Sequence, residues 1–187
     1  MTRRLLALAG KAGSGKDTVA DIIGHQDGGH VVCCGFADRL KDGLYAMLGV
    51  RMWELDRAQK EAPIPHLREL GNISPRHLAQ TLGTEWGRSI HPNLWVHLME
   101  QDMATHHAEV TIITDCRFPN EVKWVKSQGG TVWWVERDGI APVRAHASED
   151  SIGPMDCDRT IANLGTIEDL ERTVVQAWDE LTREVEA

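Results

Sequence analysis

The chain has 187 residues, of which 42% are hydrophobic, and a formal net charge of −8 at pH 7. This length fits one domain with a sizeable core, and the acidic balance argues against a protein that binds a nucleic-acid polymer across its surface. No apolar run reaches membrane-spanning length, and no secretory signal opens the chain. We therefore expect no membrane partner and a cytoplasmic location. The four cysteines form no C-x-x-C pair, which favours reduced thiols.

The first predicted elements are a buried strand over residues 5–9, a glycine-rich turn and a helix over residues 17–25. The turn has the G-x-x-x-x-G-K frame of a phosphate-binding loop, in the strand–turn–helix context that gives the frame its meaning. Its glycines let backbone N–H groups converge on an anion, and the helix N-terminus and Lys16 add positive charge. An ordinary glycine-rich turn is the alternative. The residues predicted to bind phosphate are Gly10, Lys11, Ala12, Gly13, Ser14, Gly15, Lys16, Asp17 and Thr18.

A second buried strand is predicted over residues 31–36, and a polar cluster with Asp38 and Lys41 follows it. Open α/β sheets bind ligands at the carboxyl ends of their strands, so Asp38 is a candidate site residue. The alternative is that Asp38 is the N-cap of a helix over residues 39–48. Residues 49–65 are predicted to form a loop that contains one helical turn.

The next helix is marked by Ser74 and Pro75, which have the pattern of an N-cap followed by a first-turn proline. We expect it to end near residues 87–89, and a further helix to span residues 93–105. The first of these helices carries Arg76 and Arg88. They lie twelve residues apart, so they are not expected side by side on one face of an α-helix. Each arginine either binds an anion or is a solvated surface charge.

A β-branched strand over residues 110–114 is expected at the centre of the sheet. It leads into Asp115 and Arg117, and Pro119 then opens a helix that runs to about residue 127. Asp115 suits Mg²⁺ or its water shell, or else it caps the following turn.

The remaining predicted elements are a strand over residues 131–135, a short strand over 159–161 and a helix capped by Thr166. Residues 139–158 between them are irregular and long for a structureless connection, which suggests a functional lid. The alternation of strands and helices along the chain predicts an α/β fold with a mainly parallel, doubly wound sheet.

The chemistry that these residues favour is phosphoryl transfer, which needs positioning and positive charge rather than covalent catalysis. A kinase for a small phosphorylated acceptor must also hold the acceptor's phosphate, and arginines do this through bidentate contacts. The nine histidines have no metal-site spacing, so we expect any metal to be Mg²⁺ that arrives with the nucleotide. The candidate arginines are Arg76, Arg88, Arg117 and Arg137.

Six blocks of the sequence resemble the bacteriophage-type deoxynucleoside monophosphate kinases. They run in order from Leu5 to Leu170 as GKAGSGKDT, GFADRLK, RHLAQTLGTEWGR, TIITDCRFPNE, HASE and DRTIANLGTIEDL. The resemblance implies a nucleoside-monophosphate-kinase fold with a P-loop. This fold has a five-stranded, mainly parallel sheet flanked by helices, a helical acceptor-binding insert and a lid. The implied boundaries within a single kinase domain, residues 1–187, are a core of residues 1–37, 108–137 and 158–187, an insert of about 38–107 and a lid of about 138–157.

The resemblance also implies an activity and roles for individual residues. ATP would donate its γ-phosphoryl group to a deoxynucleoside monophosphate, with Mg²⁺ as cofactor, in the host cytoplasm if the chain is of phage origin. Residues 10–18 would hold the ATP phosphates, Lys16 would follow the γ-phosphoryl group, and Arg117 would neutralise charge between donor and acceptor. The metal ligands would be Asp17, Thr18 and Asp115. The acceptor-binding residues would be Asp38, Lys41, Arg76 and Arg88, and the lid residues Arg137 and Arg144.

Two other functions stay open on the sequence. One is a P-loop kinase for another small molecule, similar to phosphomevalonate or dephospho-coenzyme A kinases. The other is a nucleotide-binding ATPase or switch that has no acceptor. Seven tryptophans supply enough apolar area for the face of a homodimer, although we expect most of them in the core.

Overall fold

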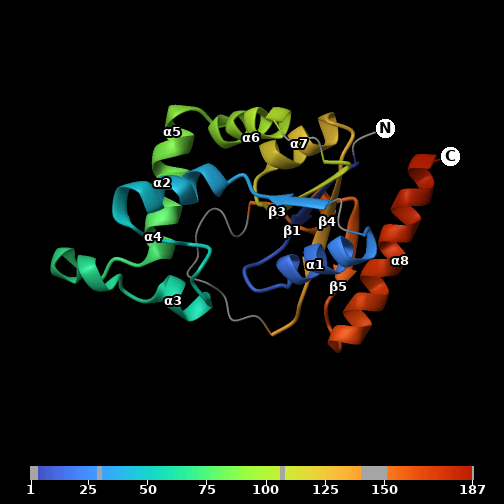
Figure 1. The fold of residues 1–187 in the computed structure, drawn as a ribbon, viewed down its shortest axis with the longest axis horizontal. Coiled ribbons are helices and arrows are strands. Elements are labelled where there is room, and N and C mark those ends of the chain that lie inside the picture. The colour runs from blue at the N-terminus through green and yellow to red at the C-terminus, as the bar shows by residue number, and fades with distance from the viewer. Residues whose placement is uncertain (1–3, 29–30, 106–107, 140–150, 187) are drawn as a thin grey trace. The chain divides into compact units, whose positions relative to one another are not determined.

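The computed structural model describes residues 4–28, 31–105, 108–139 and 151–186 (Figure 1). The chain forms two compact units. The first, which we call the sheet unit, contains residues 1–35 and 105–187, and the second, the helical unit, contains residues 36–104. In sequence, the helical unit is therefore an insertion between the second and third strands of the sheet unit.

The sheet unit is built on five strands that all run parallel. Their order across the sheet is β2-β3-β1-β4-β5, which confirms the predicted α/β fold with a five-stranded parallel sheet. The second strand is shorter than predicted, because the chain leaves the sheet after Cys34 and turns toward the next helix. The strands are β1 Arg4–Ala9, β2 Val31–Cys34, β3 Val110–Cys116, β4 Thr131–Glu136 and β5 Arg159–Ala162.

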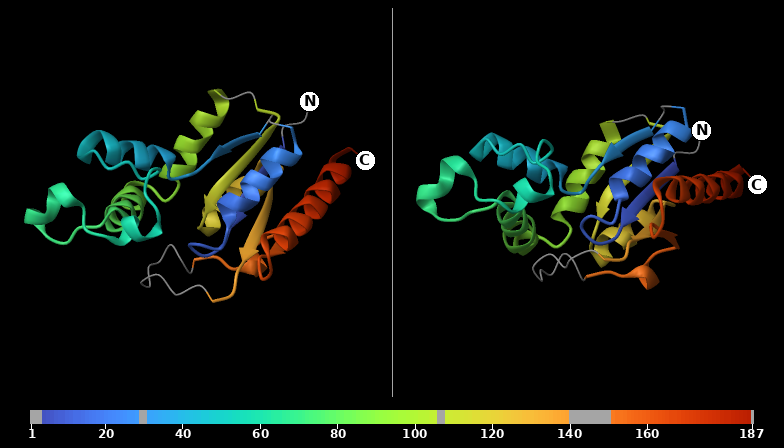
Figure 2. Two further views of the ribbon diagram at one scale, coloured as in Figure 1. Left: turned by 60° about the horizontal axis from the view of Figure 1, so that its bottom comes forward. Right: turned by 90° about the horizontal axis from the view of Figure 1, so that it is seen from below.

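Helices cover both faces of this sheet. Helices α1 (Lys16–Gln26) and α8 (Ile167–Glu186) lie side by side on one face, and α7 (Pro119–Ser127) covers the other (Figure 2). A short 3₁₀ helix, η3 (Pro154–Asp156), precedes β5. Because both faces are covered, the central strands are continuous apolar runs with no exposed side. Residues that are fully buried in this core include Leu6, Leu8, Val110, Ile112, Trp133 and Ile161.

Local capping fixes where two of these helices begin. The Oγ1 of Thr166 accepts a hydrogen bond from the Asp169 backbone N–H at 3.3 Å, and the Asp169 carboxylate accepts one from the Thr166 N–H at 3.1 Å. This is the predicted capping box of α8. At the start of α7, the buried carboxylate of Glu121 accepts from the backbone N–H groups of Arg117 at 2.7 Å and Phe118 at 3.0 Å. Glu121 therefore closes the turn between β3 and α7.

The helical unit contains five α-helices, one 3₁₀ helix and one π-helix among its described residues. They are α2 Asp38–Leu48, α3 Arg57–Glu61, η1 (3₁₀) Pro65–Leu70, α4 Pro75–Gln80, η2 (π) Thr81–Gly87, α5 Arg88–Ile90 and α6 Leu94–Thr105. Ser74 caps α4 as predicted, since its Oγ accepts from the His77 N–H at 3.2 Å. The N-cap of α2 is Ala37, and Asp38 is its first helical residue, so the capping interpretation of Asp38 is wrong.

The helix that Ser74 starts runs without a break to Ile90, but its middle is not α-helical. Seven consecutive residues, Thr81–Gly87, form a π-helix. The sequence predicted a plain α-helix here, because the spacing of its apolar residues does not distinguish the two forms. A π-helical stretch inside an α-helix is rare and is frequently found at functional sites.

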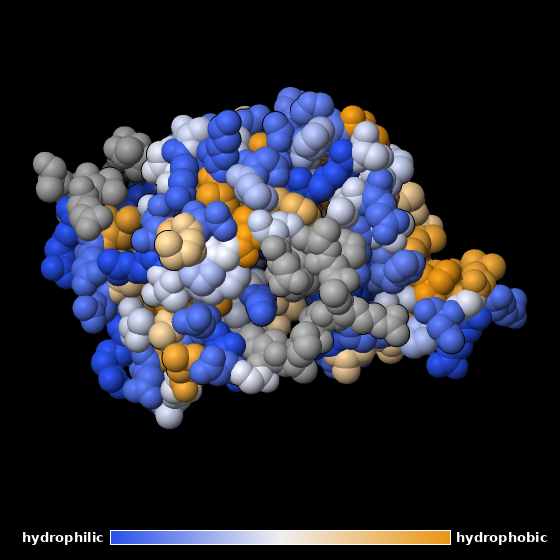
Figure 3. Space-filling model, turned by 180° about the vertical axis from the view of Figure 1, so that it is seen from behind, coloured by the Kyte–Doolittle hydropathy of each residue, from blue (hydrophilic) through white to orange (hydrophobic). Residues whose placement is uncertain are grey.

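The surface carries apolar side chains scattered among polar ones (Figure 3). Of the nine large hydrophobic side chains that are exposed in the described residues, six belong to the helical unit. These six are Tyr45, Met47, Trp53, Leu70, Trp86 and Ile90. Among the described helices, none is long and apolar enough to cross a membrane.

Candidate functional site

The phosphate-binding loop predicted over residues 10–18 has the conformation that its glycines allow. Gly10, Gly13 and Gly15 all have positive φ, at 135°, 84° and 100°. Other residues rarely adopt such values. Helix α1 begins directly after the last of these glycines, so its N-terminal N–H groups face the loop. The glycine-rich turn and the helix that the sequence predicted are therefore present, and anion binding by the loop stays a prediction.

Lys16 is held inside this loop by the loop's own oxygens. Its Nζ donates to the carbonyl of Gly10 at 2.8 Å and to that of Lys11 at 2.9 Å, and it lies 3.5 Å from the Ser14 Oγ. The side chain of Lys16 is buried, and Ser14 is fully buried. The ammonium group is thus placed at the centre of the loop and away from bulk solvent.

The ends of β4 and β5 brace the loop from the side. The Asn163 side chain, which follows β5, donates through Nδ2 to the Ser14 carbonyl at 2.8 Å. A side chain at Gly15 would place a Cβ atom 2.5 Å from that same Nδ2, and one at Gly10 would meet the Val135 carbonyl oxygen at 2.5 Å. These two glycines are therefore required by close packing as well as by their φ angles.

The end of β3 brings Asp115 and Arg117 to the same edge of the sheet. Cys116, which lies between them in sequence, pairs with Ala9, the last residue of β1 before the loop. Asp115 and Arg117 therefore lie on either side of a residue opposite the start of the loop. The carboxylate of Asp115 packs against Gly35, where an added Cβ would come within 2.5 Å of its Oδ2. Burial, with the nearby Glu121 and Asp115 carboxylates, raises the pKa of Cys116 well above its usual range. Cys116 is therefore a packed neutral thiol and not a nucleophile.

The oxygen donors at this edge fit Mg²⁺ held together with a nucleotide. Among the described residues, no three His, Cys, Asp or Glu side chains gather closely enough to hold a metal ion by themselves. In nucleotide sites, Mg²⁺ is usually bound by one or two protein oxygens plus the phosphates. The Asp115 carboxylate at the end of β3, and Thr18 with the exposed Asp17 in the first turn of α1, are hard oxygen ligands of this kind.

In the helical unit, each of the predicted acceptor-binding residues makes a polar contact. The Asp38 carboxylate accepts from Lys41 Nζ at 2.7 Å. Arg76 forms an ion pair through Nε with Glu61. Arg88 donates through Nη1 to the Pro92 carbonyl at 3.1 Å. The neighbouring Arg39 makes a two-nitrogen ion pair with Asp102, which ties α2 to α6.

The two arginines that were predicted for the lid have different outcomes. Arg137 directly follows β4 and is exposed. Arg144, together with most of the predicted lid, lies outside the described residues.

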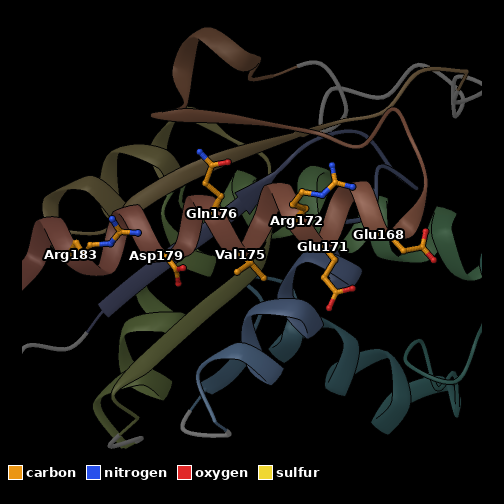
Figure 4. A pocket seen from close by; sticks show the side chains of 7 residues that line it. All are labelled: Glu168, Glu171, Arg172, Val175, Gln176, Asp179 and Arg183. Carbon is orange, nitrogen blue, oxygen red and sulfur yellow. The ribbon is translucent and has the colours of Figure 1, made fainter.

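A pocket on the sheet unit lies elsewhere. Its side chains all come from α8 and are spread along that helix, with Gln176 and Arg172 on one side of the ribbon and Val175, Asp179 and Glu171 on the other (Figure 4). None of the predicted site residues lines it. Its lining mixes acidic and basic groups, as expected for a solvated helix face. The lining residues are Glu168, Glu171, Arg172, Val175, Gln176, Asp179 and Arg183.

Sequence reasoning missed three residues that shape the site: Asn163, Glu121 as the clasp of the β3–α7 turn, and Gly35 beneath Asp115. Asn163 lies 149 residues from the loop carbonyl that it binds, so no local spacing could reveal it. Glu121 had a signal, since an acid in the first turn of a helix is a common capping pattern.

Comparison with known proteins gives a consistent result. A family model described as deoxynucleotide monophosphate kinase matches residues 67–174. A protein of Acanthamoeba polyphaga mimivirus that carries the provisional name deoxynucleotide monophosphate kinase is 30% identical over 189 residues, covering 94% of this chain and 96% of the relative. A deoxynucleoside-5'-monophosphate kinase of Escherichia phage T5 is 48% identical over 50 residues, which cover 26% of this chain and 20% of that one.

The fold is also found among solved structures. The crystal structure of TT1252 from Thermus thermophilus superposes with a TM-score of 0.53 at 20% identity, covering 97% of this chain and 99% of that one. At this identity the similarity establishes a shared fold.

Proposed function

We propose that residues 10–18 hold the ATP phosphates. The chain belongs to the deoxynucleotide monophosphate kinase family, so it transfers a phosphoryl group from ATP to a deoxynucleoside monophosphate. The observation that carries this assignment is the position of Lys16, whose ammonium group lies 2.8 and 2.9 Å from two loop carbonyls. Phosphate oxygens would replace these carbonyls as hydrogen-bond acceptors. The loop N–H groups and the α1 N-terminus would bind the same phosphates.

The residues at the end of β3 would act on the transferred group. Arg117 would place a guanidinium beside the phosphoryl group and neutralise charge as it leaves the donor. Asp115, with Thr18 or Asp17, would hold Mg²⁺ directly or through water, and that ion would withdraw charge from the β- and γ-phosphates. Glu121 and Gly35 would keep the Arg117 backbone and the Asp115 carboxylate in place.

The helical unit would bind the acceptor. Two arginines suit a phosphate monoester, because the guanidinium group binds it in a bidentate way. The Asp38–Lys41 pair would supply the remaining polar contacts to the acceptor, and Arg137 and Arg144 would close over the nucleotides as lid residues. The acceptor-binding arginines are Arg76 and Arg88.

An activity panel tests the acceptor class. Purified protein with ATP and Mg²⁺ should release ADP only when dAMP, dCMP, dGMP or dTMP is added. Ribonucleoside monophosphates, phosphomevalonate and dephospho-coenzyme A serve as competing acceptors. Turnover of either non-nucleotide acceptor, or ATP hydrolysis that is equally fast without any acceptor, would contradict the proposal. Chelation of Mg²⁺ with EDTA should abolish the transfer.

Binding titrations test the division of labour between the units. Arg88→Ala should weaken dNMP binding at least tenfold while the affinity for ATP stays within twofold. A loss of ATP affinity instead would place this arginine on the donor side.

Two finer assignments stay predictions. The apolar side chains exposed on the helical unit could pair two copies of the chain, and light scattering would reveal such a homodimer. The cytoplasm, that of the host if the chain is of phage origin, is the expected location, since it holds the nucleotide pool, and fractionation of cells that contain the protein would test it.

A further inference from the structure

The helix from Pro75 to Ile90 carries both acceptor-binding arginines, one on each side of its π-helical segment (Figure 1). In a continuous α-helix each residue advances by about 100°, so Arg76 and Arg88, twelve residues apart, would point about 120° away from each other. Two arginines in that arrangement could not face one ligand. The π-helical segment changes this geometry.

A π-helix turns more slowly than an α-helix, with hydrogen bonds from i to i+5 and about 4.4 residues per turn. Seven residues at that pitch and five at the α-helical pitch complete roughly three full turns. Three of the four pairs in this helix that lie twelve residues apart have the same burial: Pro75 and Gly87 are buried, Arg76 and Arg88 are half-buried, and His77 and Ser89 are exposed, whereas Leu78 is half-buried and Ile90 exposed. Positions twelve residues apart therefore lie on the same face of this helix.

Side chains of α2 and α6 hold the π-helical segment in place. The Trp95 indole N–H donates to the Gly83 carbonyl at 2.7 Å, a carbonyl in the segment where the regular α-helical pairing is replaced. A Cβ atom at Gly87 would lie 2.5 Å from the Trp95 ring, and one at Gly83 would lie 2.9 Å from Leu40. Both glycines thus let the segment approach its neighbours closely.

From these observations we infer that the π-helical segment is a positioning element for the acceptor site: it sets the register that puts Arg76 and Arg88 on one face, where both contact the same nucleoside monophosphate. This inference rests on the proposed acceptor role of the two arginines. The twelve residues between them span at most about 18 Å of helix axis, which suits contacts at two points of one nucleotide. Glu61 binds Arg76 through Nε and so orients its guanidinium. Trp95 acts through the helix register and touches no substrate.

The direct test is to add one residue to the segment. Insertion of an alanine directly after the exposed Glu85 should turn Arg88 by about 80–100° relative to Arg76, because the extra residue advances the helix by one π-helical or α-helical step. We expect the KM for dNMP to rise at least tenfold while the KM for ATP stays within twofold. Glu85→Ala is the matched control, because it changes a side chain at the same place and keeps the register; its KM values should stay within twofold of the parent. An insertion variant that is folded by circular dichroism and has a normal dNMP KM would overturn the inference.

A double-mutant cycle separates this inference from the proposed function. If both arginines contact one acceptor, the effects of Arg76→Ala and Arg88→Ala on dNMP affinity should be coupled by fivefold or more, and the coupling should vanish in the insertion variant. If each substitution weakens dNMP binding but the effects multiply independently, the inference fails and the acceptor assignment survives. If neither substitution affects dNMP binding, the acceptor assignment itself fails.

A gentler variant covers the case in which the insertion variant does not fold. Trp95→Phe keeps an aromatic ring at this position and removes the indole donor to Gly83, together with part of the indole ring system that packs on Gly87. We expect a three- to tenfold rise in the KM for dNMP with an unchanged KM for ATP. A merely structural role would lower the melting temperature and leave the dNMP KM as it was, and that result would also overturn the inference.

Discussion

The loop of residues 10–18 and the helix of residues 75–90 are both assigned to phosphate groups, but they reach their conformations by different means. The loop takes its shape from its own glycines, three of which have positive φ. The π-helical segment of the helix instead packs against residues outside it, Trp95 and Leu40. Whether a residue can adopt a positive φ angle depends on its own side chain, so it can be read from the local sequence. Whether a helix adopts a π-helical register depends on the side chains that pack against it. The four predictions below probe this contrast.

The largest effect is expected at the centre of the loop. Lys16→Ala should lower kcat by about 10²–10³, since it removes a charge that acts on the transferred group. The fold should survive, because the contacts of Lys16 are polar and local. Steady-state kinetics with circular dichroism would measure both, and Lys123→Ala, an exposed lysine on α7, is the control. A near-normal kcat would contradict the assigned role.

The next effect tests whether a glycine is required in the loop because of its positive φ angle or because of the atoms that pack against it. Gly15→Ala should lower the free energy of unfolding by about 2–3 kcal/mol and weaken ATP binding, because it combines an unfavourable φ with a clash against Asn163. Gly28→Ala has a positive φ of 74° but no neighbour within 4 Å, so about 1 kcal/mol is expected and no change in ATP binding. Chemical denaturation and titration would compare them; equal effects on ATP binding would rule out the packing explanation.

In the helical unit, close packing alone should make a glycine necessary. Gly87→Ala forces a methyl group against Trp95 and should cost about 1–3 kcal/mol, with a larger rise in the KM for dNMP than in that for ATP. Gly43→Ala lies within α2, 3.9 Å from the end of Met47. It should stabilise the protein by about 0.5–1 kcal/mol through helix propensity. Thermal unfolding would measure both, and a stabilising Gly87→Ala would contradict the tight packing.

The smallest effect on activity concerns the brace of the loop. Asn163→Ala leaves the Ser14 carbonyl without its 2.8 Å donor and should raise the KM for ATP about tenfold, the equivalent of roughly 1.4 kcal/mol. The KM for dNMP is the internal control and should not move. In the Gly15→Ala background, Asn163→Ala should instead recover part of the lost ATP affinity, because it removes the atom that the new methyl group meets. Purely additive effects would argue against this contact.

Sequence reasoning predicted the sheet, the helix starts and the loop because each depends on signals within a few residues. A β-branched run specifies β3, Ser74 and Thr166 specify helix caps, and the glycine spacing specifies the loop. It did not predict the π-helix, because Gly83 and Gly87 give no signal without their partner Trp95. The expectation that Arg76 and Arg88 lie on different faces assumed an α-helical pitch, and the π-helical segment removes that assumption.

The insertion of the helical unit between β2 and β3 also sets the order in which the sheet can assemble. The two strands that are synthesised first do not pair with each other, because β3 lies between them. When the first 104 residues have left the ribosome, neither strand has its partner. The arrival of β3 supplies both partnerships at once, and each is a non-local contact of the kind that slows folding. The sheet at whose edge residues 10–18 lie therefore cannot form during synthesis until Val110–Cys116 has been made.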